Sequence, residues 1–228
     1  MPAIDSHSES PVDAEAACYL AAVQQNGWAL QEVPKDQRTP ELCLAAVTQD
    51  GWALQYVPES LRTAELCLAA VQQNGWALQF VPESLRTPEL CRAAVGVGGE
   101  ALRWVPKALC TDELCRAAVD SNGYSLMYAP LHLRSAELCR VAVRGNGYAL
   151  QAVPEALRNE EICLLAVQET GWALEFVPES VRTVEMCQQA LSHGLGSGFV
   201  DDSLRDYALA RVADAGRSDP DQHIAPAP

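Results

Sequence analysis

The sequence is short of basic residues and contains no long hydrophobic run. Only 16 Lys and Arg stand against 30 Asp and Glu, which gives a net charge of −14 at pH 7. Nucleic-acid binding requires a concentrated basic surface, so we expect no nucleic-acid partner. The apolar runs are a few residues long, far below the ~20 residues of a membrane-spanning helix, so we expect no membrane partner.

The first twelve residues lack the positive end and apolar stretch of a secretory signal. We therefore expect a cytoplasmic protein, with secretion by a route that reads no such signal as the alternative.

Motifs with an established chemistry are also missing. The nine cysteines include no Cys-x-x-Cys pair, and the sequence has no nucleophile elbow, phosphate-binding loop or metal motif. The four histidines share no spacing. The sequence therefore predicts a protein that is not an enzyme, with no catalytic residue, no metal and no cofactor.

What the sequence does contain is a repeat of 24 residues. The consensus of the copies reads Thr-x-Glu-Leu-Cys-x-x-Ala-Val, then Gly-Trp-Ala-Leu, then Val-Pro-Glu. The repeated cysteines are Cys43, Cys67, Cys91, Cys115, Cys139, Cys163 and Cys187. Such regularity is typical of one supersecondary unit that stacks on its neighbours. We predict an all-α fold, an α-solenoid of tandem 24-residue two-helix repeats with about seven to eight units and degenerate terminal caps.

Each copy predicts its own local structure. Thr39 is suited to cap a helix and Pro40 to occupy its first position. At 100° per residue one arc of this helix is apolar, and it holds Leu42, Cys43, Ala46 and Val47. Gly51 is expected to end the helix in a left-handed conformation. A shorter helix follows over 52–57, and a tight turn begins at Pro58.

The repeat sets the predicted domain organisation. We expect a disordered N-terminal segment at 1–14, a helical repeat domain at 15–198, a C-terminal capping helix at 199–215 and a disordered tail at 216–228. The two ends carry about half of the net negative charge, so the repeat body has an ordinary mixed surface.

The consensus Thr-x-Glu-Leu-Cys-x-x-Ala-Val followed by Gly-Trp-Ala-Leu-x-x-Val-Pro-Glu-x-Leu-Arg resembles the repeats of the domain of unknown function 4116 family. The resemblance covers about residues 15 to 195. It implies a helical repeat fold and points to no particular activity.

The regular ladders of the repeat favour structural roles. Stacked helices lie ~8–10 Å apart, which is too far for disulfides or a shared zinc, so we interpret the repeated cysteines as buried apolar residues. The tryptophans at 28, 52, 76 and 172 are expected to pack between repeats. The repeated glutamates and the arginines at 62, 86, 134, 158 and 182 are expected to form caps and ion pairs between repeats.

One position varies while its neighbours repeat, namely the residue after each repeated cysteine. It lies ~130° from the centre of the apolar arc, at or beyond the edge of the buried face. Here Arg92, Arg116 and Arg140 stand on successive helices, and Arg144 lies one turn beyond Arg140. These four arginines are the candidate partner-binding residues, for an acidic protein partner. A solvated face without a partner is the alternative.

The sequence therefore favours a non-enzymatic scaffold for protein–protein interaction that presents an extended surface. Two alternatives stay open. One is an enzyme or ligand-binding protein with a site in the irregular fourth copy, near Glu100 and Cys110. The other is a structural spacer.

Overall fold

The computed structural model describes residues 11–193 and 202–217 of the chain. The chain divides into two compact units, residues 1–110 and 111–228, where the sequence suggests one continuous repeat domain. The described residues form α-helices and 3₁₀ helices without strands, which confirms the predicted all-α repeat fold.

Unit 1 contains four α-helices, each followed by two 3₁₀ helices. The α-helices are α1 (Pro11–Gln25), α2 (Pro40–Gln49), α3 (Ala64–Gln73) and α4 (Pro88–Val97). The six-residue 3₁₀ helices are η1 (Gly27–Glu32), η3 (Gly51–Tyr56), η5 (Gly75–Phe80) and η7 (Gly99–Trp104). The three-residue ones are η2 (Lys35–Gln37), η4 (Glu59–Leu61), η6 (Glu83–Leu85) and η8 (Lys107–Leu109).

Unit 2 continues the same order. Its α-helices are α5 (Asp112–Ser121), α6 (Ala136–Gly145), α7 (Glu160–Glu169), α8 (Val184–Ser192) and α9 (Asp202–Arg217). The six-residue 3₁₀ helices are η9 (Gly123–Tyr128), η11 (Gly147–Ala152) and η13 (Gly171–Phe176). The three-residue ones are η10 (Leu131–Leu133), η12 (Glu155–Leu157) and η14 (Glu179–Val181).

The predicted helix caps are confirmed. Thr39 Oγ1 accepts a hydrogen bond from the Leu42 amide at 3.3 Å, and Pro40 occupies the first turn of α2. Thr63, Thr87, Ser135 and their equivalents repeat this bond. These side chains satisfy an amide that has no partner within its own helix, so every copy starts its α-helix at a defined residue.

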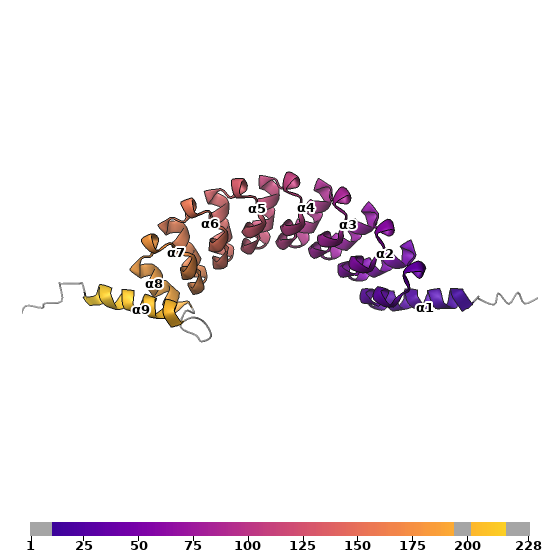
Figure 1. The fold of residues 1–228 in the computed structure, drawn as a ribbon, viewed down its shortest axis with the longest axis horizontal. Coiled ribbons are helices and arrows are strands. Elements are labelled where there is room, and N and C mark those ends of the chain that lie inside the picture. Colours follow the sequence, from indigo (N-terminus) through magenta and orange to yellow (C-terminus); the bar gives the residue numbers. More distant parts are fainter. Residues whose placement is uncertain (1–10, 194–201, 218–228) are drawn as a thin grey trace, which may run out of the picture. The chain divides into compact units, whose positions relative to one another are not determined.

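Stacking of the copies creates the core of each unit. Within a unit the α-helices lie side by side in chain order, and the six-residue 3₁₀ helices form a second row against them (Figure 1). Between the two rows lie the predicted apolar arc of the α-helix, two residues of the 3₁₀ helix and the C-cap residue of that helix. In the second copy these are Leu42, Cys43, Ala46 and Val47 together with Ala53, Leu54 and Val57, all buried.

Gly51 is required for a reason other than the predicted one. It begins η3 rather than ending α2 in a left-handed conformation, since the C-cap of α2 is Asp50. A Cβ atom on Gly51 would collide with the carbonyl oxygen of Ala70 in the next copy. The glycine therefore permits the close approach of η3 to α3.

The helix boundaries at the ends of the chain also differ from the prediction. Helix α1 begins at Pro11, inside the segment 1–14 that was expected to be disordered, and α9 extends two residues past 215. The expectations of disorder at 1–10 and 218–228 lie outside the described residues. Within the described part of the chain, no helix combines the length and the apolar character needed to cross a bilayer.

Candidate functional site

The four predicted partner-binding arginines lie on α4, α5 and α6. Arg92 belongs to unit 1, is exposed, and forms no ion pair or side-chain hydrogen bond with the described residues. Arg116 belongs to unit 2 and lies 3.7 Å from Asp112 of its own helix. Both groups of that pair are substantially exposed, so solvent screens their attraction and leaves Arg116 accessible.

Arg140 is the most engaged of the four. Its Nε donates to Glu161 Oε1 on the next helix at 2.9 Å, and its Nη1 donates to Glu137 Oε2 at 2.5 Å. The hydrogen bond from Arg140 lowers the pKa of Glu161, and Arg144 adds a smaller attraction in the same direction. Much of the positive charge of α6 is thus already paired within unit 2.

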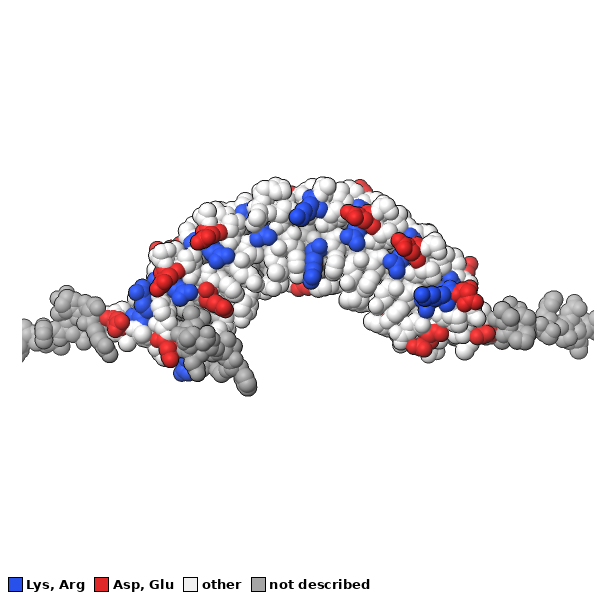
Figure 2. All heavy atoms as spheres, viewed as in Figure 1, with Lys and Arg blue, Asp and Glu red and all other residues white. Residues whose placement is uncertain are grey.

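Charges on the visible face of each unit are mixed. Figure 2 shows Lys and Arg interspersed with Asp and Glu in both units, with most of the surface occupied by uncharged residues. Electrostatic recognition on this face therefore depends on individual side chains rather than on an extended field of one sign.

On the first three α-helices of unit 1 the same register position is apolar. Leu20, Leu44 and Leu68 follow one another on α1, α2 and α3, and their exposed fractions are 37%, 40% and 37%. The sequence analysis predicts partner binding for the arginines at this variable position and does not include its leucines. The signal for the leucines was present, because a leucine beyond the edge of a buried arc has no core to enter.

Three adjoining cavities lie beside Leu20 and Leu44. One of about 610 Å³ is lined by Leu20 and Glu41, and one of about 480 Å³ by Leu20, Glu41 and Leu44. A third of about 310 Å³ is lined by Glu41, Leu44 and Glu65. Because neighbouring cavities share residues, they form one hollowed surface across α1, α2 and α3. Leu68 lies outside the cavity linings but is exposed on α3, the helix that contributes Glu65 to the third cavity. We call the surface formed by these cavities together with the exposed side chain of Leu68 the leucine groove.

The repeated arginines, in contrast, join one copy to the next through hydrogen bonds, and we call them the framework arginines. Arg62 Nε donates to the carbonyl of Val57 at 3.0 Å, and its Nη1 donates to the carbonyl of Phe80 in the next copy at 2.7 Å. The same bridge to the next copy is made by Arg38, Arg86, Arg134 and Arg158. The expectation that these arginines pair with glutamates between repeats is therefore wrong. They cap backbone carbonyl groups at the ends of 3₁₀ helices.

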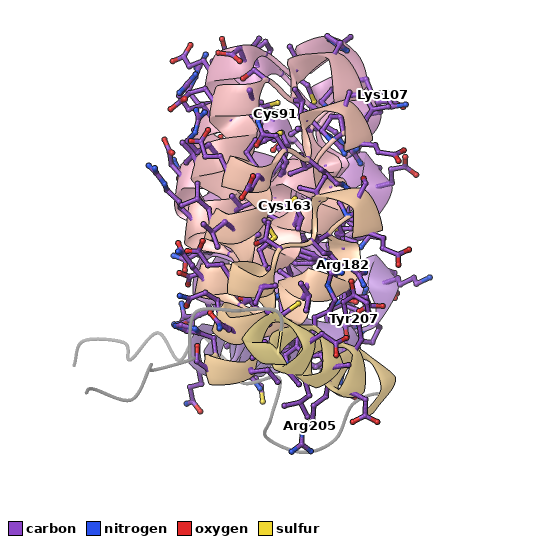
Figure 3. The ribbon with its side chains drawn as sticks, turned by 90° about the vertical axis from the view of Figure 1, so that its left-hand side faces the viewer. Cys91, Lys107, Cys163, Arg182, Arg205 and Tyr207 are labelled. Carbon is purple, nitrogen blue, oxygen red and sulfur yellow. The ribbon has the colours of Figure 1, made fainter. Side chains whose placement is uncertain are left out.

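The last framework arginine contacts α9 instead. The Arg182 guanidinium lies 5.1 Å from the centre of the Tyr207 ring, and Arg211 Nη2 donates to the Arg182 carbonyl at 3.3 Å. Figure 3 shows Arg182 and Tyr207 next to each other, with Cys163 inside unit 2. Ala208 of α9 is completely buried, so α9 covers the end of the repeat stack in unit 2.

The repeated cysteines are buried thiols, as predicted. All seven are buried, and burial raises the pKa of Cys67, Cys91, Cys139 and Cys163 to about 11. A raised pKa means less thiolate at neutral pH, and the thiolate is the reactive form. Within the described residues, no group of three His, Cys, Asp or Glu is placed to hold a metal ion.

Two of the repeated tryptophans, Trp28 and Trp52, pack against an aromatic ring of the next copy, as the sequence indicates. The Trp28 and Tyr56 rings meet edge to face with centroids 5.8 Å apart, and Trp52 and Phe80 do so at 5.7 Å. Each pair joins a 3₁₀ helix to the next one, so the rings contribute to stacking.

The fourth copy keeps the backbone of the others despite its altered sequence. Helix α4 ends at Val97 and η7 spans Gly99–Trp104, with Gly98 as the cap between them. Cys110 replaces the framework arginine at the last position of unit 1, and its sulfur lies 3.6 Å from the Pro106 carbonyl oxygen. Burial raises the pKa of the Cys110 thiol, which lowers its reactivity.

Comparison with known proteins gives one family. The family model described as "Domain of unknown function (DUF4116)" matches residues 19–62, 63–110, 111–158 and 136–182, which together span most of the chain. No curated protein and no solved structure matches the chain.

Proposed function

The chain belongs to the DUF4116 family, and we propose that it is a non-enzymatic scaffold that binds another protein along the exposed face of its α-helices. The observation that carries the proposal is the contrast between constant and variable positions. The helix caps and buried positions hold similar residues from copy to copy, whereas the residue after the repeated cysteine, exposed in most copies, changes among leucine, arginine and glutamine.

That contrast favours binding over a purely structural role. A spacer has no need for exposed leucines, which cost solubility when they form a contiguous patch. Stacked repeats place equivalent side chains on successive helices, so a partner can contact several copies at once. The candidates are the leucine groove in unit 1 and individual arginines, namely Arg92 in unit 1 and Arg116, Arg140 and Arg144 in unit 2.

The arginines would receive an acidic segment of a protein partner. Arg92 supports this use most directly, because its guanidinium is exposed and has no carboxylate partner among the described residues. Arg140 supports it less, since Glu137 and Glu161 already occupy its donors. Because the net charge of the chain is −14, we further propose that the partner is not a nucleic acid. We also propose that the protein acts in the cytoplasm.

The test is affinity capture from native lysate with the full chain as bait, followed by binding measurements with the purified protein that is retained. We expect a protein whose cross-links map to α-helix positions that follow the repeated cysteines. The absence of any saturable protein partner would refute the proposed function.

The role of the arginines is tested with the triple variant R92E, R116E and R140E. If an acidic partner docks there, the affinity falls about tenfold or more, as expected when several attractive charges become repulsive. The matched control is Lys107→Glu, an exposed charge change on η8 away from the α-helix face. Unchanged affinity with unchanged circular dichroism would remove the arginines from the interface.

A further inference from the structure

We propose that the leucine groove of unit 1 binds a basic amphipathic helix of a partner protein. This inference rests on the proposed function and assigns the chemistry of one partner. It concerns α1, α2 and α3 alone, which lie side by side within unit 1 (Figure 1).

The apolar part of the groove supplies three anchor points in a row. More than a third of the surface of each of these leucines, Leu20, Leu44 and Leu68, is exposed to solvent, although each belongs to a helix whose other face is buried. The cavities beside Leu20 and Leu44 have volumes between about 310 and 610 Å³, enough for whole side chains, and Leu68 extends the apolar row onto α3. Burying a leucine-sized side chain contributes ~1.5–3 kcal/mol, so three such sites suffice for a specific contact.

The charged part of the groove is acidic. Asp36, Glu41 and Glu65 line the three cavities, and no Lys or Arg is among the lining residues. Glu41 and Glu65 form no ion pair or side-chain hydrogen bond with the described residues, so their carboxylates are available to a partner. Positive side chains beside the apolar anchors of a partner would complement this lining.

The same charges disfavour the other occupants. A second copy placed groove to groove would set Glu41 and Glu65 against the same carboxylates. The segments 1–10 and 218–228 of this chain each carry two acidic residues and no Lys or Arg, so they bear the sign of the groove. Charge complementarity therefore selects a partner with the opposite sign.

The walls of the groove favour a helix over an extended peptide. They consist of side chains from α-helices and 3₁₀ helices and offer no strand edge. An extended peptide would leave its backbone groups without partners there, whereas a helix satisfies its own. Helices pack ~8–10 Å apart and a helix rises ~10.5 Å over seven residues, so anchors at i, i+7 and i+14 match successive copies.

The register also gives the groove a direction. The position that follows Leu68 in the next copy is Arg92, so the apolar row ends at a positive side chain on α4. A partner helix with an acidic residue one heptad beyond its last anchor would fit in one orientation only.

The experiment uses the full chain and a synthetic 22-residue helical probe with leucine at positions 1, 8 and 15, glutamate at position 22, and lysine flanking the leucines. Fluorescence anisotropy measures its Kd. The control probe carries glutamate in place of each lysine. We expect saturable one-to-one binding of the basic probe and at least ~10-fold weaker binding of the acidic one.

Substitutions then locate the site. Leu44→Gln should raise the Kd ~10-fold, because it removes the central anchor. Its matched control is Leu131→Gln, since Leu131 is 70% exposed on η10 of unit 2 and outside the groove. The double variant E41Q and E65Q leaves the apolar anchors intact and should raise the Kd about threefold at low salt.

Several outcomes would overturn the inference. These are equal affinity for both probes, equal effects of Leu44→Gln and Leu131→Gln, or tighter probe binding after removal of residues 1–10 or 218–228. A dimer in sedimentation that Leu44→Gln dissociates would assign the groove to a second copy. A captured protein whose binding depends on Arg92 or Arg140 but not on Leu44 would refute this inference while leaving the scaffold function intact.

Discussion

Replacing Arg62 by methionine tests the framework that joins successive copies. The substitution removes the hydrogen bonds from Nε to the Val57 carbonyl and from Nη1 to the Phe80 carbonyl, while keeping an unbranched apolar side chain. A hydrogen bond with a charged partner contributes ~1.5–3 kcal/mol. Because the site is only partly buried, water replaces some of this loss, and we expect destabilisation of ~2–3 kcal/mol.

Urea denaturation followed by circular dichroism measures the change in unfolding free energy. The matched control is Arg92→Met, which removes an exposed guanidinium without a partner and should change stability by less than ~0.5 kcal/mol. Arg62→Lys should lose most of the stabilisation as well, because an ammonium group cannot reproduce the two-pronged geometry.

Hydrogen exchange gives the decisive reading, because the Phe80 carbonyl belongs to the copy after Arg62. In Arg62→Met, exchange should accelerate in residues 75–85 as well as in residues 57–62. If Arg62→Met is no less stable than Arg92→Met, or if faster exchange stays confined to residues 57–62, the guanidinium does not couple the copies and the reasoning fails.

Four further predictions concern the packing of the repeats. Ser125→Ala should raise the melting temperature and stabilise the folded protein by ~1 kcal/mol. The reason is that the Ser125 hydroxyl is buried without a hydrogen-bond partner among the described residues. A loss of stability would contradict this. Gly51→Ala should destabilise by ~2 kcal/mol or more through its clash with the next copy, whereas Gly96→Ala, with open space around it, should stabilise by ~0.5 kcal/mol in the same denaturation assay. At pH 8 a thiol reagent should modify exposed Cys18 long before buried Cys67, as peptide mapping would show. Since Cys67 ionises near 9.0 when unfolded and near 11 when folded, the unfolding free energy should fall as the pH rises from 9 to 11.

The cap residues and the apolar arc could be predicted because they depend on near neighbours in the chain. Thr39 bonds an amide three residues away, and Leu42, Cys43, Ala46 and Val47 share a face through the helix period alone. Cys110 was also recognised as a departure from the repeat, although its regular backbone surroundings were not foreseen.

Predictions failed where the decisive atom lies in another copy. Arg62 looked like one half of an ion pair, but its partner is a backbone carbonyl 18 residues further along the chain. Gly51 looked like a helix terminator, but the close contact is with Ala70 in α3. Sequence patterns show side chains that recur and do not show which backbone groups they meet.

The sequence by itself determined the repeat, its register, the buried face of each α-helix and the positions of the caps, because a 24-residue period and local hydrogen bonds are written in consecutive residues. Only the tertiary structure decided that Leu20 and Leu44 line adjoining cavities, that Glu41 and Glu65 have no partner among the described residues, and that Arg140 is already bound to Glu161. Those properties arise when helices from different copies come together, and distances between copies are set by packing.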